Sequence, residues 1–79
     1  MMATTELGTL SLSGTKKGVI SISNVSEPYG KGTEDIVSIG ISLNGKDIEW
    51  KSHIPYANLD DVIKILQEAS EAKKKEEEQ

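Results

Sequence analysis

The sequence predicts an α+β domain, a four-stranded antiparallel sheet of two hairpins with one C-terminal helix packed on one face (ββββα). Residues 7–13 and 19–25 alternate apolar with small polar residues, which is typical of strands with one buried face. Residues 36–54 repeat the pattern around Asn44-Gly45, the preferred pair for a two-residue type I′ turn. From residue 58, apolar residues recur at the spacing of an amphipathic helix.

The first hairpin turns in the segment 14–18, where a glycine at each end supplies the positive φ that short turns need. Pairing Leu12 with Ile20 also pairs Leu10 with Ile22, so a single register buries all four apolar side chains.

The second hairpin has its register fixed by the predicted turn at Asn44-Gly45. On the inner face, Ile41 then lies opposite Ile48, and Ile39 lies opposite Trp50. Residues 26–35 contain proline, glycines and charges without an apolar period, so they form the loop between the two hairpins.

The last element is predicted to begin with Asn58 as N-cap, with Asp60 and Asp61 in the first turn, where carboxylates suit the helix dipole. Ile65 lies on the flank of its apolar stripe, and we expect it to contact a second copy together with Ala69. The stripe comprises Leu59, Val62, Ile63, Leu66 and Ala69.

The expected organisation is one ββββα domain over residues 7–71, between a disordered N-terminus at 1–6 and a frayed charged tail at 72–79. A chain of 79 residues has a marginal core, so we expect a homodimer. The predicted core comprises Leu10, Leu12, Ile20, Ile22, Val37, Ile39, Ile41, Ile48 and Trp50 under Leu59, Val62, Ile63 and Leu66.

Composition narrows the classes of function. The chain has no cysteine, which excludes disulfides, thiolate zinc sites and cysteine nucleophiles, and favours a cytoplasmic protein. No apolar stretch is long enough for a signal peptide or a membrane span. All nine positive charges are lysines and the net charge is −4, so the acidic, arginine-free composition disfavours binding to nucleic acid.

Two surfaces are candidate binding sites. The sheet face opposite the core is rich in serine, and short side chains let another surface approach closely. This serine-rich face comprises Thr9, Ser11, Ser13, Ser21, Ser23, Ser38, Gly40 and Ser42. Its candidate contacts are Ser11, Ser21, Ser38 and Ser42 together with Lys51 on the last strand, and the alternative is a face that is merely solvated. The second surface is the loop, with Tyr29 and Lys31 as partner contacts.

We predict no catalytic residue, no metal ligand and no cofactor, and therefore no enzyme. The segment 29–33 lacks the spacing of a phosphate-binding loop. A single histidine, His53, cannot supply a zinc site without cysteines. Asp47 and Glu49 are two apart on one strand, but no predicted element forms a cleft around them.

Two hairpins followed by one helix resemble the single-stranded-DNA-binding domain of the positive cofactor four family of transcriptional coactivators. The resemblance covers about residues 10–68, and its local similarities are Lys17-Gly18, the segment 40–44 and the final helix. In that family the helix helps to form a dimer, and the sheet carries a basic, aromatic groove. This chain has no arginine or phenylalanine for such a groove, so we transfer no site residue.

These observations predict a small, non-catalytic, homodimeric interaction domain that binds a protein partner. The alternative function is single-stranded nucleic-acid binding of the positive cofactor four type. Its phosphate contacts would be the lysines of the sheet half, Lys16, Lys17, Lys31, Lys46 and Lys51.

Overall fold

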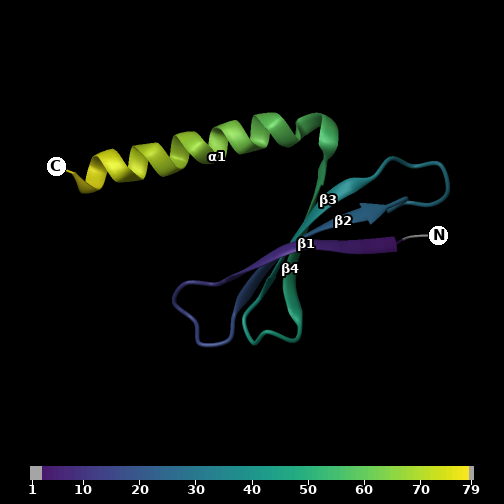
Figure 1. Cartoon of the computed structure of the whole chain (residues 1–79), viewed down its shortest axis with the longest axis horizontal. Coiled ribbons are helices and arrows are strands. Elements are labelled where there is room, and N and C mark those ends of the chain that lie inside the picture. Colours follow the sequence, from purple (N-terminus) through teal and green to yellow (C-terminus); the bar gives the residue numbers. More distant parts are fainter. Residues whose placement is uncertain (1–2, 79) are drawn as a thin grey trace.

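A computed structural model describes residues 3–78, and it confirms the ββββα fold. The four strands form one antiparallel sheet in the order β1-β2-β3-β4, and a single helix follows the last strand (Figure 1). The elements are β1 Ala3–Ser11, β2 Val19–Ser26, β3 Ile36–Ser42, β4 Ile48–Pro55 and α1 Tyr56–Glu77.

The sheet has the two predicted faces. On one face, a cross-strand row joins Leu10, Ile20, Ile41 and Trp50, and we call this side the apolar face. On the serine-rich face, the next row joins Thr9, Ser21, Gly40 and Lys51. The alternation of apolar and polar residues therefore predicts correctly on which face of the sheet most strand side chains lie.

The predicted register of the first hairpin is wrong. Ile20 pairs with Leu10, and Ile22 pairs with Gly8, so β1 is displaced by two residues. The turn is centred one residue earlier than predicted, because the Leu12 amide donates to the Gly18 carbonyl oxygen at 2.9 Å and the loop between them comprises residues 13–17. Inside this loop, the Thr15 hydroxyl donates to the Leu12 carbonyl oxygen at 2.7 Å.

The register of the second hairpin also differs by two residues. Ile41 pairs with Trp50, and Ser42 pairs with Ile48, with Glu49 as the extra residue of a β-bulge. The bulge moves Ile48 from the predicted core to the serine-rich face, where its Cδ1 would lie 3.1 Å from a Cβ added at Gly40.

The side chain of Asn44 explains this register. Its Oδ1 accepts hydrogen bonds from the backbone amides of Lys46 at 2.8 Å and Asp47 at 2.9 Å, and the Gly45 amide donates to Ser42 Oγ at 2.9 Å. An asparagine side chain thus stabilises a longer connection than the two-residue turn that the Asn-Gly pair predicts.

We expect Asn44→Ala to lower the free energy of unfolding by about 1–2 kcal/mol, because two backbone amides lose their acceptor. Asn44→Ser, which keeps a short side-chain acceptor, should recover part of the loss. Urea unfolding at one fixed protein concentration measures both variants. Equal stability of Asn44→Ala and the wild type would show that the turn does not depend on this side chain.

The first strand begins earlier than predicted, at Ala3, which pairs with Ser26 of β2. A second irregularity lies between Glu6 and Gly8, so Leu7 is an extra residue in the ladder. Of the segment 1–6 that we predict to be disordered, residues 3–6 are therefore in β1, and residues 1 and 2 lie outside the described part.

The helix begins at Tyr56, directly after Pro55, without a side-chain cap. Asn58 is therefore inside the helix and is not its N-cap, and no acidic residue lies in the first turn, so the predicted places of Asp60 and Asp61 are wrong. The helix continues to Glu77, through most of the segment 72–79 for which we predict fraying.

The predicted core is largely exposed in the single chain. The only apolar side chains that are buried within residues 3–78 are Val25, Ile36 and Val37, whereas Trp50 is 58% exposed and Leu66 is 60% exposed. The reason is the course of α1, which leaves the end of β4 and runs beyond the sheet (Figure 1). The helix makes repeated contacts only with β4, so it does not cover the apolar face.

The overall dimensions show that the folded chain is less compact than a typical domain of its length. The radius of gyration is 15.0 Å, against about 12 Å for a compact domain of this length. The accessible surface is 6345 Å², against about 4,700 Å² for a compact monomer of this mass. The isolated chain therefore leaves a large surface uncovered.

Candidate functional site

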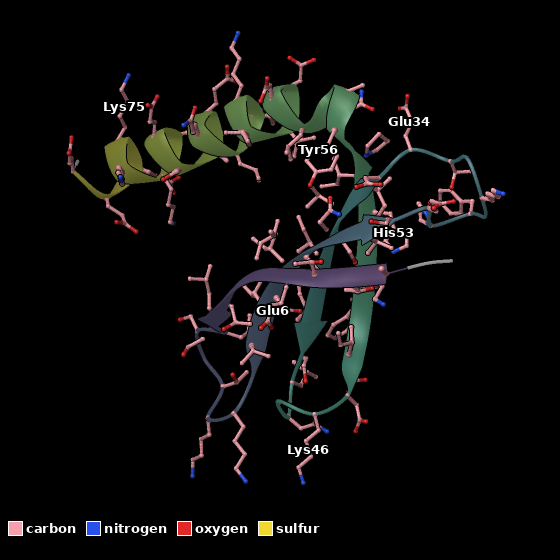
Figure 2. All side chains as sticks on the ribbon, turned by 45° about the vertical axis from the view of Figure 1, so that its right-hand side comes forward. Glu6, Glu34, Lys46, His53, Tyr56 and Lys75 are labelled. Carbon is pink, nitrogen blue, oxygen red and sulfur yellow. The ribbon has the colours of Figure 1, made fainter. Side chains whose placement is uncertain are left out.

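An apolar cleft of about 290 Å³ lies between the apolar face of the sheet and the helix. Its sheet wall comes from all four strands and is formed by Leu7, Ile22, Val37, Ile39 and Ile54. Its helix wall is formed by Tyr56, Leu59, Val62, Ile63 and Leu66. The two walls separate because α1 meets the sheet only near its first turns, as Figure 2 shows at Tyr56.

The junction between helix and sheet is fixed by a short polar chain. The Tyr56 hydroxyl donates to Asn24 Oδ1 at 2.7 Å, and Asn24 Nδ2 donates to Asp35 Oδ2 at 3.1 Å. These bonds hold the first helical turn against β2 and the loop that follows it. After the first helical turn, the side chains of the helix wall are partly uncovered, since Ile63 is 43% exposed and Leu66 is 60% exposed.

The predicted dimer contacts lie on the same helix but outside the cleft walls. Ile65 is 63% exposed, and it follows the helix flank beside Leu66, which is in the cleft wall. Ala69, the last residue of the stripe, is exposed three residues after Leu66. The cleft is therefore lined by the earlier residues of the stripe, Leu59, Val62, Ile63 and Leu66, and by neither of the two predicted dimer contacts.

The predicted serine contacts are spread over the opposite face. Ser21 and Lys51 lie on either side of Gly40 in one row, while Ser11 lies at the end of β1, on the outside of the sheet. Ser38 and Ser42 are only 5% and 3% exposed, and the Ser42 hydroxyl is used within the turn. Ser11, Ser21 and Lys51 are therefore the contacts on this face that a partner could reach.

The loop between β2 and β3 presents an aromatic side chain over this face. Tyr29 is 72% exposed, its ring centroid lies 6.2 Å from that of His53, and its hydroxyl lies 3.4 Å from His53 Nδ1. The loop is ordered by its own hydrogen bonds, such as that from the Gly32 amide to Glu27 Oε2 at 3.0 Å. Lys31 is exposed in the same loop, two residues after Tyr29.

Asp47 and Glu49 lie in the turn and at the bulge of the second hairpin. Asp47 Oδ2 accepts a hydrogen bond from Asn44 Nδ2 at 3.1 Å within the turn, and Glu49 is the exposed bulge residue. Within residues 3–78, no group of three or more His, Asp or Glu side chains could hold a metal ion. No helix in the same part of the chain is long and apolar enough to cross a membrane.

Sequence reasoning missed three residues of the cleft: Leu7, Ile54 and Tyr56. A signal exists for Ile54, because it continues the alternation through Trp50 and Ser52 and lies opposite Val37. Leu7 reaches the cleft only because of the irregularity in β1, and no local pattern indicates that.

Searches with this chain against protein-family models, curated proteins and solved structures find no match. The resemblance to the positive cofactor four family therefore rests on the element order and the short similarities given above.

Proposed function

We propose that this chain is a non-catalytic interaction domain that works as a homodimer and binds a partner with the rest of its surface. The observation that carries the proposal is the open apolar cleft, with walls formed by ten side chains and little covering from the chain itself. Exposed apolar patches of this kind mark interaction surfaces in soluble domains.

The surface area of the chain supports self-association. The accessible surface exceeds that of a compact monomer by roughly 1,600 Å², whereas each partner in a standard interface buries about 800 Å². Burial of apolar surface stabilises by about 25 cal/mol per Å², so covering the cleft supplies stability that this small core lacks.

Sedimentation velocity at protein concentrations from one to one hundred micromolar tests the dimer. We expect a species of twice 8.6 kDa, whose sedimentation coefficient is clearly larger than that of the extended monomer. A chain that stays monomeric across this range would overturn the proposal, because the cleft would then be open in solution.

The partner surface in this proposal is the serine-rich face with the adjoining loop, since a dimer through the cleft leaves it free. Tyr29 and Lys31 project from the loop, and Ser11, Ser21 and Lys51 lie on the strands. Exposed tyrosine is enriched in protein interfaces, and flanking small side chains permit a close approach.

Single-stranded nucleic acid is a second candidate for the same surface, favoured by one observation. Tyr29 and His53 present neighbouring rings, and Lys51 lies on the same face of the sheet as His53. Aromatic rings with lysines alongside can stack bases and contact phosphates. The net charge of −4 opposes this function.

Fluorescence anisotropy of a labelled single-stranded oligonucleotide, titrated with the protein at about 50 and 200 mM salt, decides between the two partners. Nucleic-acid binding requires saturable binding that weakens with salt and is lost in Tyr29→Ala. We expect no saturable binding, as the acidic composition implies, which leaves a protein as the partner.

A further inference from the structure

The turn between β3 and β4 contains Asn44-Gly45, a pair in which the asparagine side chain is readily attacked by the backbone nitrogen that follows it. Glycine has no side chain to shield this nitrogen, so it can approach the Asn44 Cγ. The turn lies at the end of the sheet away from the helix, as Figure 2 shows at Lys46. Asn44 and Gly45 are both exposed, so water can reach them.

We propose that Asn44-Gly45 is a self-modification site, which the folded turn keeps unreactive and which reacts when the turn opens. In the reaction, the Gly45 backbone nitrogen forms a bond to the Asn44 Cγ and gives up its proton. The bond from Cγ to Nδ2 breaks, and the side-chain nitrogen leaves with that proton as ammonia. Water then opens the resulting succinimide ring to aspartate or isoaspartate, so the only reagent consumed is water.

The atoms that take part in this reaction are all hydrogen-bonded in the folded turn. The Gly45 amide donates to Ser42 Oγ at 2.9 Å, so the proton of the attacking nitrogen is engaged. Asn44 Oδ1 accepts from the amides of Lys46 at 2.8 Å and Asp47 at 2.9 Å, and Asn44 Nδ2 donates to Asp47 Oδ2 at 3.1 Å. Ring closure moves Cγ and both of its side-chain substituents, so the reaction requires these bonds to break first.

The fold requires both members of the reactive pair. Gly45 has a positive φ of 80°, which side chains disfavour, and a Cβ added there would lie 2.8 Å from the Lys17 carbonyl oxygen of the first hairpin. Asn44 is required because its side chain selects the register of the second hairpin. The hydrogen bonds of the turn are therefore the means by which the folded chain can keep the pair without reacting.

The products of the reaction cannot restore the same turn. In isoaspartate the main chain runs through Cβ and Cγ, so the oxygen that accepted from the Lys46 and Asp47 amides becomes a backbone oxygen. In aspartate, a carboxylate replaces the amide group that donated to Asp47, and two carboxylates at this distance repel each other. Either product therefore marks, in a permanent way, a chain whose second hairpin has opened.

Peptide mapping by mass spectrometry, after incubation in a mildly alkaline buffer with and without guanidinium chloride, measures the rate at each asparagine. The two other asparagines precede Val25 and Leu59, whose side chains hinder the attack, so Asn24 and Asn58 are internal controls. We expect Asn44 to react at least ~10-fold more slowly in the folded protein, because the rate follows the population of the open turn.

Equal rates in the two conditions would overturn the proposal, because the folded turn would then give no protection. A faster reaction in the folded protein would also overturn it, and would mean that the Lys46 and Asp47 amides stabilise the oxyanion that forms at Asn44 Oδ1.

Ser42→Ala tests the contacts of the turn without changing the reactive pair. It removes the hydroxyl that accepts from the Gly45 amide and donates to Asn44 Oδ1 at 3.2 Å. We expect Asn44 to react about 3–10-fold faster in the folded variant, from the loss of such bonds, and at an unchanged rate in guanidinium chloride. Ser38→Ala is the matched control, since Ser38 is similarly buried on the same strand and lies outside the turn. An unchanged rate in Ser42→Ala, or an equal rise in Ser38→Ala, would overturn the proposed protection by the turn.

The stability of the modified chain tests the consequence for the hairpin. Modified chains carry an additional negative charge, so ion exchange separates them from unmodified chains after return to native buffer. We expect a lower denaturant midpoint for the modified chains, measured at the same protein concentration. Equal midpoints would show that the turn re-forms after the reaction, and would overturn the inference that the modification is a lasting change of structure.

Discussion

Leu66→Asp is expected to convert the proposed homodimer into a monomer at micromolar concentration, with a dissociation constant raised at least ~100-fold. Leu66 is 60% exposed in the single chain and lies in the helix wall of the cleft. In the dimer, a carboxylate at this position would be transferred from water into apolar surroundings without a partner, which is strongly unfavourable. Sedimentation velocity across a concentration series gives the two dissociation constants.

Ile65→Asp is the matched control for this prediction. Ile65 is the adjacent residue, has a similar exposure of 63%, and does not line the cleft. We expect this variant to remain dimeric, with a change in the dissociation constant below about tenfold. The reverse result, with Ile65→Asp monomeric and Leu66→Asp dimeric, would place the interface on the helix flank, as the sequence predicts.

Ile36→Ala is expected to lower the free energy of unfolding by about 2–4 kcal/mol, because it leaves a cavity at one of the few buried side chains. Ile36 is 5% exposed and pairs with Val25, which is 4% exposed. Urea unfolding at matched protein concentrations measures the effect.

Ile48→Ala provides the comparison, since it removes the same atoms from a side chain that is 49% exposed on the serine-rich face. Its expected cost is about 1 kcal/mol or less. The sequence assigns Ile48 to the core, so a larger loss for Ile48→Ala than for Ile36→Ala would support the sequence-based register over that of the structure.

The fold class follows from the sequence because each element has a pattern of its own period. Alternation identifies the strands, and the spacing of Leu59, Val62, Ile63 and Leu66 identifies the helix, whatever their exact ends. The serine-rich face is likewise predicted, since a shift of two residues leaves a side chain on its original face, and Ile48 changes face because of the β-bulge.

The registers and the helix start could not be predicted in the same way. The Asn44-Gly45 pair favours a tight turn, and only the bonds made by the Asn44 side chain select the longer one. Asn58 is a good cap residue, yet the N-cap position falls three residues earlier, at Pro55, which ends β4 and precedes Tyr56, whose hydroxyl bonds to Asn24.

The cleft could not be predicted from the sequence, because it depends on the course of the helix relative to the sheet, which no local sequence pattern indicates. Amphipathic periodicity indicates that one helix face avoids water, but it does not identify the surface that covers it. The sequence predicts that the stripe packs on the chain's own sheet and that the flank at Ile65 contacts a partner. In the structure the stripe itself is left open, since α1 diverges from the apolar face after its first turns.

The irregularities in β1 and β4 have a consequence for how copies can add to each other. These are the two edge strands of the sheet, and each carries one extra residue, Leu7 in β1 and Glu49 in β4. An interrupted hydrogen-bonding edge is a poor template for a strand from another molecule, which protects open sheets from ribbon-like aggregation. Because both edges are interrupted, edge-to-edge growth into fibrils is disfavoured, and association through the exposed apolar surface is limited to the proposed closed dimer.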